Sequence, residues 1–133
     1  SEILYQGRRI AMIAVGNMVE EAEIAYHQLQ DEGMDITFVN ARFIKPLDEE
    51  LLLQLAGEHD VIVTVEEHVL YGGYGEAVDA FYMQQDIRNI RVHNIAIPDT
   101  FVEHGSVAKL RESLGLDAES IAHTVADYWN TQE

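Results

Sequence analysis

Apolar residues along the chain follow two different periods. Four short runs, at residues 10–15, 36–41, 61–66 and 90–97, are almost wholly apolar or alternate apolar with polar residues. Such runs are typical of strands, and the continuous ones are typical of strands covered on both faces. The segments between them place apolar residues three and four positions apart, which predicts helices. The pattern therefore predicts strands that alternate with helices.

Polar residues and glycines mark where the predicted helices begin and end. Asn17 is placed as an N-cap, with Glu20 three residues later to complete a capping box, and Gly33 ends that helix. Asp48 caps a second helix, which Gly57 ends. Further helices are predicted over residues 73–85, from Ser106 to Gly115, and from Asp117 onward.

The strands predict one mixed sheet. Residues 2–5 predict a fifth, short strand, and residues 6–8 would turn it back antiparallel onto residues 10–15. The other strands each return through a helix, which makes them parallel. We expect a single domain over residues 1–133, an α/β fold with three layers. Its predicted architecture is an α/β/α sandwich on a five-stranded mixed sheet with one antiparallel edge strand.

The charge balance excludes several classes of partner. The chain has 24 acidic and 8 basic residues, a net charge of −16, and no cysteine. So little positive charge argues against nucleic acid and anionic membranes, and no apolar run approaches the roughly 20 residues that cross a bilayer. The absence of cysteine excludes disulfides and thiolate metal ligands and fits a cytoplasmic protein. Because the chain opens at Ser1, we expect a processed chain or a cut fragment.

The segment VEEHVLYGGYGEAV, residues 65–78, combines a strand, a glycine-rich turn and a helix, as a phosphate-binding loop does. Its spacing does not fit a nucleotide loop, because the third glycine of a dinucleotide fingerprint falls on Val78 and no Lys-Ser or Lys-Thr follows. Glu66 and Glu67 at the strand end would also repel a pyrophosphate. We expect the glycines to permit positive φ or a close approach between the helix and another backbone.

Candidate chemistry gathers beyond the carboxyl ends of the parallel strands, where open sheets place their sites. We call this edge the rim; it includes residues 16–17, 42–45, 66–68 and 98–99. Glu66 and Glu67 are adjacent on a strand, so their side chains diverge and do not form an acid/base pair. We predict that one of them forms a structural ion pair with Arg42.

No complete catalytic or metal-binding set is recognisable. The six histidines show no metal-ligand spacing, and no serine stands in a G-x-S-x-G turn. His68 and His104 are the two histidines on rim loops. Tyr71, Tyr74 and Tyr82 are expected to pack against neighbours rather than to stack on a base. We therefore assign no catalytic, cofactor-binding or metal-binding residue to the chain.

Four segments carry a resemblance to a known family. They are NARFIKPLDEELL, VTVEEHVLYGGYGEAV, IAIPDTFVEHGS and LGLDAESI, in this order. Together they resemble the C-terminal domain of 1-deoxy-D-xylulose 5-phosphate synthase, a transketolase-like thiamine diphosphate enzyme, over about Gly7 to Ile121. The first two motifs also resemble the β subunit of the 2-oxoacid dehydrogenase E1 component. Thr100, His68, Tyr71 and Tyr74 depart from the family pattern, which leaves room for a divergent paralogue.

The resemblance implies a transketolase C-terminal-like fold within a larger, homodimeric enzyme. That enzyme would condense pyruvate with glyceraldehyde 3-phosphate and release carbon dioxide, and it would serve isoprenoid and thiamine biosynthesis. Its thiamine diphosphate and Mg²⁺ would be held by a Gly-Asp-Gly…Asn segment on another domain, and this chain has no Gly-Asp-Gly. The chain alone is then expected to be inactive. Its implied contacts with neighbouring domains and the dimer partner are rim residues: Arg42, Glu66, Glu67, His68, Gly72, Gly73, Gly75, Asp99 and His104.

Two other functional hypotheses are compatible with the sequence. A related enzyme, a 2-oxoacid dehydrogenase E1 β subunit or a split transketolase, would place the missing domains on the same or another polypeptide. The synthase-like FVEHG weighs against it. A free-standing acidic binding or regulatory module belongs to a different class, and an open reading frame that begins at this segment would favour it.

Overall fold

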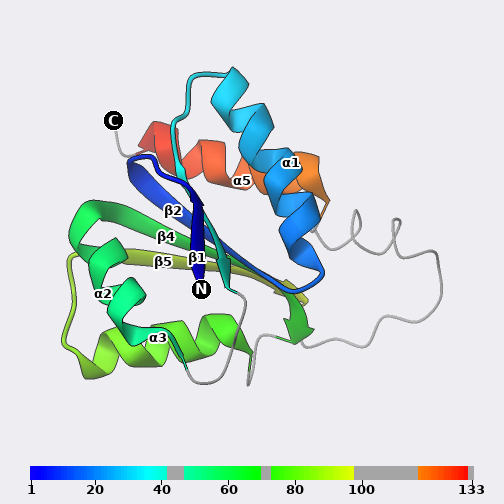
Figure 1. Cartoon of the computed structure of the whole chain (residues 1–133). Coiled ribbons are helices and arrows are strands. Elements are labelled where there is room, and N and C mark those ends of the chain that lie inside the picture. The colour runs from blue at the N-terminus through cyan, green and yellow to red at the C-terminus, as the bar shows by residue number, and fades with distance from the viewer. Residues whose placement is uncertain (42–46, 70–72, 98–116, 132–133) are drawn as a thin grey trace.

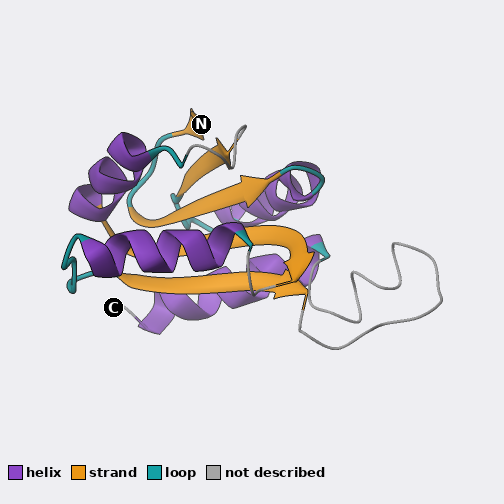
Figure 2. Cartoon of the chain, turned by 90° about the horizontal axis from the view of Figure 1, so that it is seen from below, coloured by secondary structure: helices purple, strands orange, loops and turns teal. Residues whose placement is uncertain are grey.

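The fold is an α/β/α sandwich, as the sequence predicts (Figures 1 and 2). The computed structural model describes residues 1–41, 47–69, 73–97 and 117–131. The strands are β1 (Glu2–Tyr5), β2 (Arg9–Val15), β3 (Thr37–Ala41), β4 (His59–Val69) and β5 (Arg91–Ile97). The helices are α1 (Met18–Asp31), α2 (Glu49–Glu58), α3 (Tyr74–Gln84) and α5 (Ala118–Thr131). The helix predicted after Ser106 lies outside the described residues.

The five strands form one mixed sheet in the order β1-β3-β2-β4-β5. Strands β2 to β5 are parallel, and β1 is the antiparallel edge strand. The predicted partner of β1 was wrong, because β1 pairs with β3 and not with residues 10–15. Between β1 and β2 the chain passes across the start of β3. There the Gly7 N–H donates to Thr37 Oγ1 at 2.9 Å and the Arg8 N–H donates to the Asp35 carbonyl at 2.8 Å.

Each face of the sheet has its own apolar core. Alternate residues of β2 point to opposite faces, so Ile10, Met12 and Ala14 pack under α1 and α5. Ala11, Ile13 and Val15 pack under α2 and α3. The nearly continuous apolar run of β2 is thereby explained, since both faces of the strand are covered. Figure 1 shows the sheet between two helical layers, with α1 and α5 on one side and α2 and α3 on the other.

Local signals at helix ends were partly correct. The Asp48 carboxylate accepts a hydrogen bond from the Leu51 N–H at 3.2 Å and so caps α2, as predicted. Gly33, with φ of 86°, follows the end of α1, and α2 ends at Glu58, one residue beyond Gly57. The predicted capping box at Asn17 was wrong, because Asn17 has helical φ and ψ and its side chain caps no N–H. In the described part of the chain, no helix is long and apolar enough to cross a membrane.

Candidate functional site

The rim is built around Glu66, near the carboxyl end of β4. Its side chain is fully buried. Oε1 accepts a hydrogen bond from the Tyr74 N–H at 2.8 Å, and Oε2 accepts one from the Gly75 N–H at 2.5 Å. Tyr74 and Gly75 open α3, and the first N–H groups of a helix have no acceptor within the helix. One carboxylate thus satisfies two of the free donors of α3 at the positive end of its dipole.

The glycine turn brings α3 close to the sheet. Gly73 is the N-cap of α3 in an extended conformation, and its carbonyl accepts from the Ala77 N–H at 3.2 Å. A Cβ on Gly75 would lie 2.7 Å from the Asn94 side chain and 2.9 Å from Thr64 Oγ1. Glycine at 75 is therefore a packing requirement, in line with the close approach expected from the sequence, and the neighbour it approaches is a pair of polar side chains.

Those two side chains belong to a hydrogen-bonded line beneath α3. The Thr64 hydroxyl donates to Asn94 Oδ1 at 2.6 Å, and Asn94 Nδ2 donates to Asp79 Oδ2 at 2.7 Å. Burial raises the pKa of Asp79, the hydrogen bond from Asn94 acts in the opposite direction, and the charge of Glu76 raises this pKa further. The line joins β4, β5 and α3 and gives the start of α3 a polar support on the sheet.

The remaining rim candidates are placed only in part. Glu67 follows Glu66 on β4 and is half-buried. The predicted loop position of His68 was wrong, because β4 continues to Val69 and includes His68. Tyr74 and Tyr82 are buried on α3, as predicted for packing residues. The following candidates lie outside the described residues: Arg42, Tyr71, Gly72, Asp99, Thr100 and His104. The predicted ion pair of Arg42 with Glu66 or Glu67 stays a prediction.

A second buried polar network, at the opposite end of the sheet, was missed by sequence reasoning. His59 at the start of β4 is 5% exposed. Its Nδ1 lies 2.9 Å from the Leu55 carbonyl and its Nε2 lies 2.7 Å from Thr37 Oγ1. A carbonyl can only accept, so Nδ1 donates to Leu55, and Nε2 shares a hydrogen bond with the Thr37 hydroxyl. Both ring nitrogens are committed to the fold, which makes His59 a structural residue.

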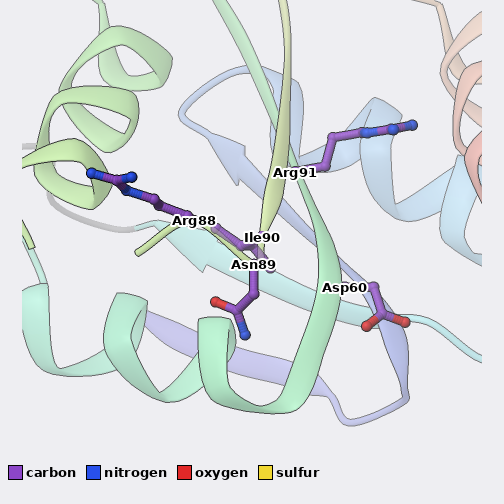
Figure 3. Close-up of a pocket in the computed structure, with 5 residues that line it drawn as sticks. All are labelled: Asp60, Arg88, Asn89, Ile90 and Arg91. Carbon is purple, nitrogen blue, oxygen red and sulfur yellow. The ribbon is translucent and has the colours of Figure 1, made fainter. Parts of the chain in front are cut away.

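Two hollows lined by described residues do not converge on a reactive group. One, of about 510 Å³, is lined by Gly16, Asn17, Val19, Glu20 and Glu23. The other, of about 430 Å³, is lined by Asp60, Arg88, Asn89, Ile90 and Arg91 (Figure 3). Figure 3 shows the side chains of Arg88 and Arg91 pointing away from each other, and Arg88 Nε bonds Asp86 Oδ1 at 2.8 Å. This geometry cannot clamp an anion. Among the described residues there is also no cluster of three His, Asp or Glu side chains suited to a metal ion.

A comparison with protein families decides the relationship. The family model described as transketolase, C-terminal domain, matches residues 1–121. The chain belongs to the transketolase C-terminal domain family. The strand, glycine turn and helix that carry Glu66 and Gly75 lie within the matched residues, so in this transketolase C-terminal domain the segment is part of the family fold.

Curated relatives name one enzyme. The domain is 48% identical to a 1-deoxy-D-xylulose-5-phosphate synthase of Lachnoclostridium phytofermentans over 124 residues. These residues cover 93% of this chain and 20% of that protein. It is 47% identical over 125 residues to the synthase of Brevibacillus brevis, again with 20% of the relative covered. The transketolase C-terminal domain thus spans about a fifth of the length of these relatives.

Solved structures agree on the fold. A split-gene transketolase, described as an inactive β4 tetramer, matches with a TM-score of 0.86 and 31% identity, over 96% of this chain and 41% of that one. The transketolase of Campylobacter jejuni matches with a TM-score of 0.66 at 14% identity, over 94% of this chain and 18% of that one. The second likeness shows the fold alone.

Proposed function

We propose that this domain belongs to a thiamine diphosphate-dependent 1-deoxy-D-xylulose-5-phosphate synthase. That enzyme would join pyruvate to glyceraldehyde 3-phosphate with release of carbon dioxide. The observation that carries the proposal is the 48% identity to such a synthase over 93% of this chain. The synthase-like segments IAIPDTFVEHGS and LGLDAESI support the same choice over the wider transketolase class.

The proposed part of the domain in that enzyme is architectural. The described residues do not fit thiamine diphosphate, because the natural place for a diphosphate, the N-terminus of α3, already holds the Glu66 carboxylate. The chain also lacks a Gly-Asp-Gly segment. We therefore place the cofactor and its Mg²⁺ on other domains of a cytoplasmic homodimer. The rim would contact those domains. Glu66 is buried, so its part would be to hold Gly73 and the start of α3 in place behind that surface.

The test is the whole protein. The source DNA upstream of the Ser1 codon is sequenced, and the complete open reading frame is expressed and assayed with pyruvate and glyceraldehyde 3-phosphate. We expect a frame that encodes a Gly-Asp-Gly…Asn segment and a protein that makes 1-deoxy-D-xylulose 5-phosphate when thiamine diphosphate and Mg²⁺ are added. A complete protein that carries this segment, binds the cofactor and does not form the product would contradict the proposal.

A split transketolase is the second candidate, and the structural likeness to the split-gene protein favours it. The identity is lower there, 31% against 48%. The two candidates differ in where the cofactor segment is encoded. In the split case the frame that contains Ser1 would lack that segment, and the purified product would need a second polypeptide for activity.

A further inference from the structure

The start of α3 has the layout of an anion site. Strand β4 ends at Val69, Gly73 is the N-cap of α3, and the first N–H groups of the helix point at a single acceptor group. In phosphate-binding loops that acceptor is a ligand from solution. Here it is Glu66 of the same chain, whose two oxygens each accept one backbone N–H.

The surroundings leave this carboxylate enclosed. Glu66 has no exposed surface, and Tyr74, whose N–H it accepts, is 2% exposed. The close contact of Gly75 with Thr64 and Asn94 holds the helix start against the sheet from below. A buried carboxylate is costly unless its oxygens are hydrogen-bonded, and here both are. The geometry therefore fixes the position of α3 relative to β4.

We propose that Glu66 is a positioning residue of the rim, acting as a built-in anion that holds residues 73–75 in place and closes the start of α3 to phosphate. The inference rests on the proposed function only where it treats the rim as a surface that contacts neighbouring domains. The bonds of Glu66 themselves are a property of this chain and can be tested without turnover.

The experiment measures amide hydrogen exchange at Tyr74 and Gly75 by NMR in the 133-residue chain and its variants. In Glu66→Ala, exchange at both amides should become about ten- to a hundredfold faster, the range expected when hydrogen bonds to a charged group are lost. Added formate should enter the vacated space and return both amides toward the wild-type rate. Such rescue would not occur if the side chain only filled volume.

Glu66→Gln is the matched variant, because it keeps the shape and removes the charge. Its amide group offers one acceptor and one donor, so one of the two backbone N–H groups should lose protection, and formate should have no effect because the space is filled. Glu76→Gln removes the same charge from the first turn of α3 and should leave both amides near the wild-type rate. If Glu66→Ala does not fold, the Gln variant still decides the question.

Three results would overturn the inference. One is unchanged exchange at both amides in Glu66→Gln, and another is a folded Glu66→Ala that formate does not restore. The third is saturable binding of inorganic phosphate at Tyr74 and Gly75 in the wild-type chain. Failure of the synthase assay on the whole protein would leave these measurements standing, so the two proposals can fail separately.

Discussion

At the scale of single residues, the packing of α3 at the rim depends on the absence of a side chain at Gly75. Gly75 carries no Cβ, and this lets α3 start within contact of the Thr64 and Asn94 side chains. Those side chains are themselves hydrogen-bonded to each other and to Asp79. They cannot move aside without breaking a hydrogen bond, so no space for a Cβ can open at Gly75.

Gly75→Ala is expected to destabilise the fold by about 1–3 kcal/mol, the usual cost of forcing an extra carbon into a packed site. Urea unfolding followed by circular dichroism measures this loss. Gly57→Ala is the matched control, because a Cβ there meets nothing within 4 Å and the residue lies inside α2. That control should be neutral or gain up to about 1 kcal/mol from better helix propensity. Equal effects at the two positions would refute the packing role of Gly75.

His93 on β5 gives the fold a dependence on pH. Its Nδ1 lies 2.9 Å from the Tyr128 hydroxyl, and burial lowers the pKa of this histidine. The folded state therefore prefers the neutral ring, whereas the unfolded chain has a pKa of about 6.5. The His93 contribution is present above about pH 6.5 and is lost as the pH falls through the lower folded pKa.

The prediction for His93 is a difference in slope. Between pH 7.5 and 5.5 the free energy of unfolding should fall more steeply in the wild-type chain than in His93→Gln, which cannot titrate at this position. Urea unfolding at several pH values measures both slopes. Parallel slopes would show that His93 contributes nothing to the pH dependence.

At the scale of elements, α5 is held at both ends by residues far away in sequence. The Ala118 N–H at its start donates to Glu21 Oε2 of α1 at 3.0 Å. Near its end, Arg9 Nη2 donates to the Trp129 carbonyl at 3.1 Å, and the same guanidinium lies 4.4 Å from the centre of the Trp129 ring. Helix α5 is thus tied to α1 and to the start of β2.

Glu21→Ala is predicted to cost about 1 kcal/mol, the typical loss when a capping side chain is removed. Thermal or urea unfolding measures the change. Glu20→Ala serves as the control, because Glu20 is exposed and, like Glu21, lies in the first turn of α1. The loss at Glu21 should exceed that at Glu20. Equal losses would mean that the bond to Ala118 does not stabilise α5.

The elements also show which features the sequence can predict. The cap at Asp48 was predictable because donor and acceptor are three residues apart. The donors to Glu66 are eight and nine residues away, and they become visible only when the start of α3 is placed. The Thr37–His59 bond spans 22 residues and two elements, and no local pattern signals it. Interactions between residues close in sequence could thus be predicted. Pairings between distant residues, including the pairing of β1 with β3, depend on how the sheet is assembled.

At the scale of the whole molecule, the domain is a layered α/β/α unit, and its described residues form no complete catalytic or metal-binding set. Two hollows lined by described residues lie on different elements, and neither of these two brings charged side chains together as a clamp. With a net charge of −16, it also repels phosphorylated ligands at long range. Both properties agree with the supporting role proposed for the domain.

The isolated chain is predicted to bind no thiamine diphosphate and to make no sugar phosphate. Titration calorimetry with thiamine diphosphate and Mg²⁺ tests binding, and release of carbon dioxide from pyruvate in the presence of glyceraldehyde 3-phosphate tests turnover. A full-length synthase measured in parallel is the positive control. Turnover by the 133-residue chain alone would reject the supporting role.

The position of β1 outside β3 delays the pairing of β1 while the chain is being synthesised. Ile3 pairs with Val39, so during synthesis β1 has no native partner until β3 has been made. At roughly 5–20 residues per second, that delay is a few seconds. During it, the nearest available edge is β2, and a hairpin with β2 would occupy the place that β3 must take. We expect the crossing at Gly7 to Thr37, which forms only when β3 is present, to favour the native order of strands. Pulse-labelled hydrogen exchange should then show β1 protected after β3.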